Sequence, residues 1–461
     1  MTERAVVGES MRRIVAAIVV ALLLAPAAGA GAAPGEGPGA APPIRPLIFV
    51  HGGAGSGAQF ETQAMRFTSN GYPQDRLAVH EYDSTFGINT MDQVWAGLDA
   101  LIAAELAESG ADQVDLAGHS LGTAVLQGYL TSSAERAARV AHYVNIDGRT
   151  GTAPPGGVPT LAVWGEGNPA RQIVGAENYY APDQSHVQVA TSAETFGQMY
   201  RFLTGEEPAT TDVVPERPGR VRISGEANLF PSNVGAVGIT VDIWRVKAST
   251  GERRGDAPKA TFTVAADGSW GPVAVNGNQY YEIALSRGDG SAHHFYFQPF
   301  LRSDHFVRLL TSEPGTGIDL LRDQSDHHTS LTVSRYKEWW GDQAAGNDVL
   351  EIAGTNVVTP VIAPRTKRVN ALFAFDDGVD GITNLAAPIP ELFALPFISG
   401  ADLVIPATLP PDTAVPLRMV ARDGGGGDHV INVRNWPSDN HHISVQFRDF
   451  EQADDTWPYS G

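Results

Sequence analysis

The 461-residue chain contains no cysteine. This absence excludes disulfides, a thiol nucleophile and a lipid attached to an N-terminal cysteine. A chain of this length can be stable through packing alone, because dependence on disulfides is mainly a property of small domains. Basic residues are also scarce: 32 Lys and Arg stand against 52 Asp and Glu, which gives a net charge of −20. Phosphate backbones need basic patches, so we expect no nucleic-acid partner.

The apolar run near the N-terminus, residues 14–24, is too short to cross a bilayer. It follows Arg12-Arg13 and precedes small residues at 28–30 that suit cleavage. This pattern predicts a signal peptide over residues 1–30 and therefore a secreted protein, with the export pathway left open. Residues 31–44 are rich in proline, glycine and alanine, and we expect them to form a linker without a fold of its own.

The most informative stretch is VDLAGHSLGT, residues 114–123, in which a short apolar strand leads through Gly118-His119-Ser120-Leu121-Gly122 into a helix. A serine hydroxyl is a weak nucleophile unless a tight turn holds it where a histidine and backbone N–H groups reach the reacting atoms. The two glycines keep side chains out of that turn. The motif predicts a nucleophile elbow with Ser120 as the nucleophile.

A glycine-rich loop follows an apolar strand upstream, in the sequence PLIFVHGGAG of residues 46–55. Such a loop supplies one backbone donor for an oxyanion, and we assign that donor to Gly53. The second donor is the N–H of Leu121 at the start of the helix after the serine, where the helix dipole also favours negative charge. Without the elbow, this loop would be read as an ordinary strand-to-turn exit.

The base must be chosen among thirteen histidines. In this class of enzyme the nucleophile precedes the acid, and the acid precedes the histidine. His186 lies in a polar loop just before a helix predicted over residues 192–203, where such a histidine belongs, and we assign the base to it. A plain exposed loop residue is the alternative. His119 lies inside the elbow with its ring pointing away from the serine. Three further histidines lie at or within predicted strands and are more simply interpreted as packed or turn residues: His51, His80 and His142.

The acid is less clearly marked. After the penultimate strand, the position expected to hold aspartate is Asn168. One strand earlier an apolar run ends in Asp147, at the sheet edge where the site must lie, and this residue is our assignment. Glu166 and Asp183 remain alternatives, although an acidic loop residue is more often a surface carboxylate. In the predicted mechanism the acid orients the histidine, the histidine takes the serine proton, and an acyl-enzyme forms and is hydrolysed.

Several runs of the sequence resemble the archaeal two-domain lipase and carboxylesterase family, over nearly the whole mature chain. The resemblance implies an α/β-hydrolase fold and ester hydrolysis. It places the family triad on Ser120, Asp147 and His186, and the oxyanion donors on Gly53 and Leu121. The runs that carry it are residues 51–67, 70–73, 81–83, 114–123, 185–196, 375–381, 396–407 and 442–447.

One departure from this family concerns the lid. Long-chain members insert a helical lid after the strand that ends in Glu81-Tyr82-Asp83, whereas here a helix begins near Thr90. The lid is absent, which bears on interfacial activation and acyl-chain preference rather than on ester chemistry. We expect a small-molecule or lipid ester as substrate, with at most peripheral contact with lipid aggregates. Acyl length and oligomeric state stay open.

The pattern along the chain predicts an α/β fold. Strands and helices alternate over residues 45–207, including an amphipathic helix at 91–108, which indicates a compact α/β-hydrolase with a mostly parallel sheet. Residues 208–219 are a linker. Short alternating strands then predict a C-terminal β-sandwich region, with one module at 220–315 and a second at 316–461, or one composite domain. The predicted strands include 239–246, 260–264, 280–285 and 295–297.

Metal sites are not indicated. Residues 376–381 resemble part of a calcium loop but lack its acidic twelfth position, and an Asp/Gly turn is favoured. The adjacent pairs His327-His328 and His441-His442 would point to opposite faces of a strand. We therefore predict no metal and no cofactor.

Two classes of function follow. The first is a serine carboxylic ester hydrolase in which the β region shapes the acyl site. Residues 390–398 are a candidate lining of that site, with a place in the core as the equal alternative, and they are the candidate lid if an interface activates the enzyme. The second is a surface- or polymer-binding protein that keeps the hydrolase fold as a scaffold. Acyltransferase and peptidase activities use the same triad, so the fold alone does not separate them from ester hydrolysis.

Overall fold

The computed structural model describes residues 44–422 and 428–448. The predicted signal peptide lies outside the described residues, as does all but the last residue of the predicted linker at 31–44. Residues 449–461 of the predicted second β module also lie outside. Within the described ranges, no helix is long and apolar enough to cross a membrane.

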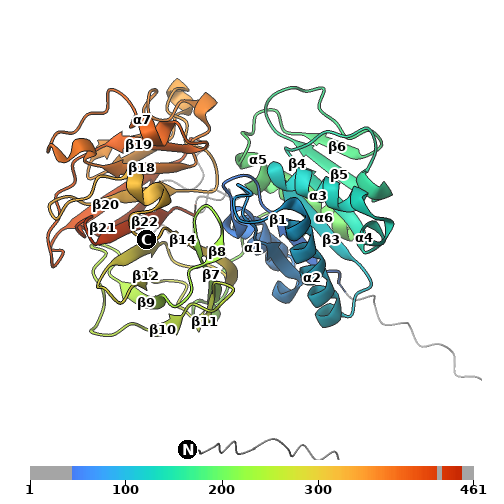
Figure 1. Ribbon diagram of the computed structural model, residues 1–461, viewed down its shortest axis with the longest axis horizontal. Helices are drawn as coiled ribbons and strands as arrows, with labels where there is room; N and C mark the ends of the chain where they lie inside the picture. The colour runs from blue at the N-terminus through green and yellow to red at the C-terminus, as the bar shows by residue number, and fades with distance from the viewer. Residues whose placement is uncertain (1–43, 423–427, 449–461) are drawn as a thin grey trace, which may run out of the picture. The chain divides into compact units, whose positions relative to one another are not determined.

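The N-terminal part of the described chain contains a six-stranded sheet with the strand order β2-β1-β3-β4-β5-β6 (Figure 1). Every neighbouring pair is parallel, which confirms the predicted parallel sheet of an α/β fold. The strands are short and mostly buried, as strands covered by helices on both faces must be. Their bounds are β1 (Leu47–Val50), β2 (Leu77–His80), β3 (Val114–His119), β4 (Val140–Ile146), β5 (Thr160–Trp164) and β6 (Glu177–Tyr180).

Helices cover both faces of this sheet, and the alternation of side chains along β1 shows how. Leu47 and Phe49 pack in one core with α1 and α6, whereas Ile48 and Val50 pack in another with α2 and α3. All four side chains are fully buried. The helices are α1 (Glu61–Ser69), α2 (Met91–Ser109), α3 (Leu121–Ser132), α4 (Ala134–Ala138), α5 (Gln188–Thr191) and α6 (Ala193–Thr204).

A short loop joins β2 to α2, at the place where the sequence predicts that no lid is inserted. The carboxylate of Asp83 accepts hydrogen bonds from the N–H groups of Gly87 and Ile88, at 2.7 and 3.0 Å, and so folds the loop back on itself. Thr90 and Gln93 then form a capping box that starts α2. The helix predicted at residues 91–108 is confirmed, and the connection from β2 to α2 contains no helical insertion.

The remainder of the described chain is rich in β structure and forms three sheets (Figure 1). The largest has eight strands in the order β10-β9-β12-β13-β22-β15-β18-β19, and two four-stranded sheets pack beside it. The strands are β7 (Arg222–Leu229), β8 (Val234–Gly235), β9 (Thr240–Val246), β10 (Ala260–Thr263), β11 (Ser269–Ala274), β12 (Tyr280–Ser286), β13 (Ala292–Phe297), β14 (Asp304–Thr311), β15 (Leu331–Ser334), β16 (Val349–Ile352), β17 (Thr355–Asn356), β18 (Ala371–Phe375), β19 (Ile398–Asp402), β20 (Ala414–Val420), β21 (Asp428–Arg434) and β22 (His441–Gln446).

The eight-stranded sheet runs through both predicted β modules. Strand β13 pairs in parallel with β22, which places Phe295 opposite Ser444 although the two residues are far apart in the sequence. On one face, alternate residues such as Val333 and Val445 pack against the sheet formed by β16, β20 and β21. The other face carries the intervening residues, among them Thr332 and Ser444, and lines the cavity described below.

Candidate active site

Ser120 occupies a strained turn between β3 and α3, with φ 51° and ψ −118°. A positive φ is uncommon for a residue with a side chain, and it is maintained here by the surrounding packing. A Cβ atom on Gly122 would lie 2.2 Å from the carbonyl oxygen of Val50, and one on Gly118 would lie 2.9 Å from Gly122. Only glycine fits at either position, so the predicted role of the two glycines is confirmed.

Asp147 and His186 form a hydrogen-bonded pair. Asp147 directly follows β4, and its Oδ2 atom lies 2.6 Å from Nδ1 of His186. Its Oδ1 atom accepts the N–H of Gly165 at 2.8 Å and lies 2.8 Å from a guanidinium nitrogen of Arg171. Burial opposes the ionisation of Asp147, but these partners, His186 foremost, hold the pKa of this carboxyl below its ordinary value. The carboxylate therefore accepts the Nδ1–H, which leaves Nε2 of His186 available.

The other residues that were weighed as the acid lie elsewhere. Glu166 pairs with the guanidinium of Arg365 at 2.7 Å. This ion pair joins the domain predicted over residues 45–207, called the hydrolase part below, to the β-rich part that follows it. Asp183 is exposed. The side chain of Asn168 accepts the N–H of Ala170 within its own turn. Of the acidic residues weighed for this role, only Asp147 has its carboxylate within hydrogen-bond distance of the His186 ring.

The glycine-rich loop after β1 lies against the serine. A Cβ on Gly52 would be 3.0 Å from the Cβ of Ser120, so this glycine permits the close approach. The Gly52 N–H donates to the side chain of Gln59 at 3.1 Å. In the part of the chain that the structure describes, the N–H groups of Gly53 and Leu121 have no acceptor. Two backbone donors near the serine are thus unoccupied.

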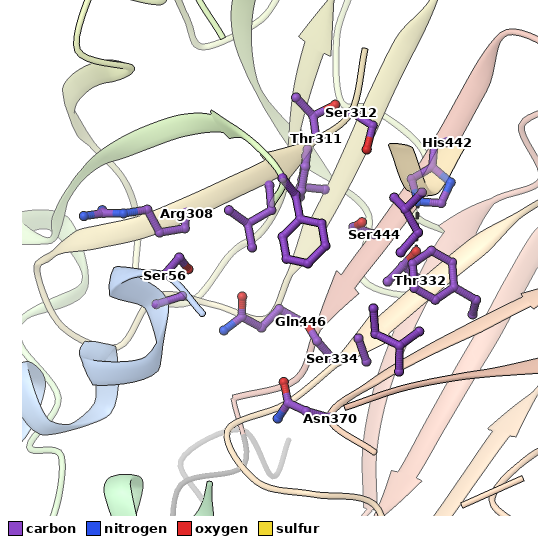
Figure 2. A pocket seen from close by; sticks show the side chains of 18 of the residues that line it. Ser56, Arg308, Thr311, Ser312, Thr332, Ser334, Asn370, His442, Ser444 and Gln446 are labelled. Atoms are coloured by element: carbon purple, nitrogen blue, oxygen red, sulfur yellow. Dashed lines mark hydrogen bonds between the residues drawn. The ribbon is translucent and has the colours of Figure 1, made fainter. Parts of the chain in front are cut away.

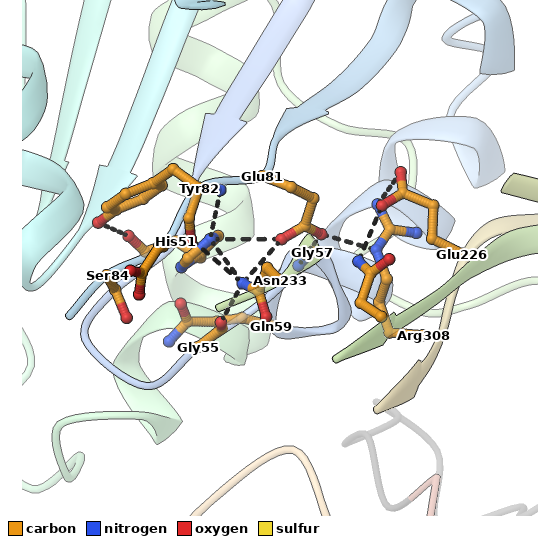
Figure 3. Close-up of polar contacts among 12 residues, drawn as sticks. His51, Gly55, Gly57, Gln59, Glu81, Tyr82, Ser84, Glu226, Asn233 and Arg308 are labelled. Carbon is orange, nitrogen blue, oxygen red and sulfur yellow. Dashed lines mark hydrogen bonds and ion pairs between the residues drawn. The ribbon is translucent and has the colours of Figure 1, made fainter. Parts of the chain in front are cut away.

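Two side chains from the β-rich part hold this loop in place (Figure 3). Asn233 donates to the carbonyl of Gly55 at 2.8 Å and to Glu81 at 3.2 Å. The guanidinium of Arg308 lies 2.6 Å from Glu81, which also accepts the N–H of Gly57 at 2.7 Å. Burial opposes the ionisation of Glu81, yet the charge of Arg308 lowers the pKa of this carboxyl to about 2. The loop geometry therefore depends on residues outside the hydrolase part.

A third side chain of the β-rich part, Glu338, holds the segment that contains the histidine. Its fully buried carboxylate accepts the hydroxyl of Ser185, the N–H of Val187 at 2.6 Å and the N–H of Gln188 at 3.2 Å. These donors flank His186 on both sides. No motif in the sequence indicates this contact. The available signal is a carboxylate among the three aromatic residues at 336–340, because a charge that is buried among them requires partners.

His119 supports the same segment from the hydrolase side. Its Nδ1 accepts from the side chain of Gln59 at 2.6 Å, and its Nε2 donates to the carbonyl of His186 at 2.7 Å. Burial, together with the neighbouring His186, lowers the pKa of His119 to about 3, so the ring is neutral. His119 therefore acts as a hydrogen-bonding strut in the elbow and does not face the serine hydroxyl.

Phe397 covers one face of the histidine. The rings of Phe397 and His186 are nearly parallel, at an interplanar angle of 12° and a centroid distance of 6.0 Å. Phe397 lies between the short helix α7 (Pro390–Phe393) and β19. Together with Pro396 and Ile398 it lines the cavity, which confirms the end of the segment 390–398 as lining.

A cavity of about 310 Å³ begins at Ser120 and His186 and extends over the inner face of the eight-stranded sheet. Figure 2 shows residues of β22 and β15 along its floor, with Arg308 and Thr311 of β14 on another side. Its apolar lining residues include Phe230, Phe295, Phe297, Leu310, Ile318, Phe373, Phe397 and Ile398. The serine and histidine thus open onto a mainly apolar space that the β-rich part encloses.

Family models match three successive parts of the chain. Residues 47–234 match the alpha/beta hydrolase family, and residues 219–314 match the lipase C-terminal domain. The chain therefore contains an α/β-hydrolase domain, and the region that follows it is similar to a lipase C-terminal domain. Residues 317–451 of this hydrolase match a further model, described as a C-terminal domain. The second and third matches fall on the β-rich part.

Solved structures with some likeness to this hydrolase include proteins from Listeria, Aspergillus and Saccharomyces. The product of the gene lin2722 from Listeria innocua is 15% identical over 36% of this chain and 96% of its own, with a TM-score of 0.28. Lipase B of Aspergillus fumigatus is 15% identical over 36% and 54%, with a TM-score of 0.29. A soluble variant of monoglyceride lipase from Saccharomyces cerevisiae is 10% identical over 37% and 89%, with a TM-score of 0.27. No curated protein matches the chain.

Proposed function

We propose that this hydrolase is a secreted serine esterase or lipase that cleaves carboxylic esters through a Ser120–His186–Asp147 triad. The observation that carries the proposal is the pairing of Asp147 with Nδ1 of His186 in the cavity that also exposes the strained Ser120. The same arrangement of nucleophile, base and orienting acid recurs in hydrolases with unrelated folds. Secretion rests on the signal peptide predicted at residues 1–30.

In this proposal Nε2 of His186 takes the proton of Ser120 as its oxygen attacks the ester carbonyl carbon. The N–H groups of Gly53 and Leu121 stabilise the negative oxygen of the tetrahedral intermediate. When the intermediate collapses, the alcohol leaves with the proton from the histidine and an acyl-enzyme remains. Water then attacks the acyl-enzyme by the same route and releases the acid. Asp147 keeps the histidine ring in the required tautomer throughout.

A chromogenic butyrate ester tests this proposal directly. We expect turnover with saturation kinetics, and covalent labelling of Ser120 by a serine-directed phosphonate, located by peptide mass spectrometry. With a longer ester, the rate should rise smoothly through the micellar limit, because the short β2–α2 loop contains no lid for an interface to open. No butyrate turnover would contradict the proposal. A sharp jump at the micellar limit would show that another segment, such as residues 390–398, moves as a lid.

Glu338→Gln should lower kcat by about 10²-fold with little change in KM. The glutamine keeps one oxygen and turns its NH₂ group toward one of the two N–H groups, of Val187 or of Gln188, which then loses its acceptor. The segment that holds the histidine would therefore shift, and misplacement by about 1 Å costs roughly this factor. The matched control is Glu351→Gln, a surface carboxylate that pairs with Arg418. An unchanged kcat in a folded Glu338→Gln protein would show that the carboxylate does not position the histidine.

A further inference from the structure

We propose that the end of the cavity remote from Ser120 is a polar subsite, formed around His293, Thr332 and His442, which binds an oxygen at the far end of an apolar acyl chain. The expected substrates are therefore esters of acids with a terminal hydroxyl or carboxyl group. This inference rests on the proposed ester hydrolysis and names its substrate class.

The strand register defines the two ends of the cavity. Gln446, Ser334, Ala371 and Ile398 lie side by side in one row across β22, β15, β18 and β19. This row adjoins the hydrolase part, because Gln446 donates to Glu61 of α1 and the residue before Ile398 stacks on the catalytic histidine. It is the near row of the cavity floor.

The far row lies further along the same strands. His442 is four residues before Gln446 on β22, which is about 13 Å at ~3.3 Å per residue, and it stands opposite His293 of β13. Figure 2 shows His442, Ser444 and Gln446 in succession along the floor. Between the two rows, Phe295 and Phe373 line the cavity. The register places the hydroxyls of Ser444 and Thr332 between these two phenylalanines, in the same row. An acyl chain that leaves the serine thus crosses a row with aromatic rings at its two sides and hydroxyl groups at its centre before it reaches the far row.

The far row carries more hydrogen-bonding capacity than an alkyl end would need. His293 lies 3.0 Å from the hydroxyl of Thr311 and 2.8 Å from that of Ser444, so both of its ring nitrogens have partners. His442 contacts the hydroxyl of Thr332 through Nε2 at 2.9 Å. A cavity that ended in alkyl contacts would be lined there by apolar side chains. Here the floor ends in two histidines with the hydroxyl of Thr311 beside them, and the hydroxyls of Thr332 and Ser444 lie one row nearer the serine.

One polar atom of this row lacks a partner. Nδ1 of His442 is closed to solvent and has no hydrogen bond within the described chain. A buried polar group without a partner destabilises the folded state and is uncommon in folded proteins. Nδ1 is closed to the cavity as well as to bulk solvent, so a ligand oxygen at this end would bond to the hydroxyl of Thr332, which lies next to the same ring.

The charges around the far row fit an uncharged oxygen. Burial, and next to it the positive charge of Arg322, hold the pKa values of His293 and His442 well below their ordinary value, so both rings are neutral. Arg322 pairs with Asp319, and Arg287 donates to Thr311 and to a backbone carbonyl. Two guanidinium groups, of Arg287 and Arg322, and two carboxylates, of Asp319 and Asp439, line this end of the cavity, so its charges balance and an uncharged hydroxyl group suits it.

The test compares chromogenic esters of decanoate, ω-hydroxydecanoate and ω-carboxynonanoate. For the wild-type protein we expect kcat/KM to be higher for the oxygen-ended esters by about fivefold to tenfold, which is the value of one net hydrogen bond. The kcat/KM for the ω-hydroxydecanoate ester, divided by that for the decanoate ester, should fall to about one, or below it, in Thr332→Val and His442→Phe. The matched control is His327→Phe, which replaces an exposed histidine outside the cavity and should keep the wild-type ratio.

Binding measurements separate this inference from the proposed function. In Ser120→Ala, calorimetry should give a tighter Kd for free ω-hydroxydecanoic acid than for decanoic acid, whether or not the wild-type protein cleaves esters. If the wild-type protein does not cleave the butyrate ester but Ser120→Ala still binds ω-hydroxydecanoic acid more tightly than decanoic acid, the ester-hydrolase proposal fails and the polar subsite is supported. If the wild-type protein cleaves butyrate normally but its kcat/KM for the decanoate ester equals or exceeds that for the oxygen-ended esters, the proposed subsite is overturned. If His442→Phe does not fold, Thr332→Val and the wild-type ratio decide.

Discussion

Ser120→Ala should lower kcat for a chromogenic butyrate ester by about 10⁶, which is the usual effect of removing the nucleophile of such a triad. The loss is this large because the variant leaves no hydroxyl group in the elbow for His186 to activate. Stability should hardly change, since the side chain makes no hydrogen bond within the described chain and the turn is fixed by Gly118 and Gly122. Steady-state kinetics and thermal unfolding measure the two effects.

The control for this variant is Ser132→Ala, an exposed serine at the other end of the same helix, α3. It should keep the wild-type kcat. Turnover by Ser120→Ala within tenfold of the wild type would remove the assignment of the nucleophile. It would also favour the interpretation of the hydrolase fold as a scaffold for a binding protein.

Local pattern was enough to predict the parallel sheet and its helices. The spacing of Val94, Leu98 and Ile102 predicts α2, and the capping box at Thr90 sets its start. The strands predicted in the β-rich part also occur, within about a residue for β9, β10 and β12. The pairing of β13 with β22 could not be predicted in this way. Parallel strands that lie far apart in the sequence leave no local signal for their register.

The candidate site likewise combines features that the sequence predicts with contacts that it does not. The elbow, the glycine loop and the histidine loop each follow a strand of one sheet, so chain order alone places Ser120, Gly53 and His186 at one edge. The side chains that fix these loops come from elsewhere. Glu338 and Asn233 belong to the β-rich part, and their partners are backbone groups that any sequence offers equally. Such contacts become visible only when the two parts of the chain are seen together.

Asp147→Asn should lower kcat by about 10⁴, the cost of a histidine held in the wrong tautomer by a neutral neighbour. The asparagine amide can turn its NH₂ group toward Nδ1 of His186, which then keeps its proton on Nε2 and no longer accepts one from Ser120. The effect should persist at every pH near neutrality, because the pKa of Asp147 is already below its ordinary value and the carboxylate stays ionised there. Steady-state kinetics across the neutral and mildly alkaline range measure it.

Glu166→Gln is the matched control, because it removes the same charge from the alternative acid. It should cost little activity, since Glu166 contacts Arg365 rather than the histidine. The comparison is sensitive because both carboxylates lie near the end of β5: Asp147 accepts the N–H of Gly165, and Glu166 is the next residue in the chain. A large loss in Glu166→Gln with a small one in Asp147→Asn would move the acid to Glu166 and would require the histidine loop to rearrange before catalysis.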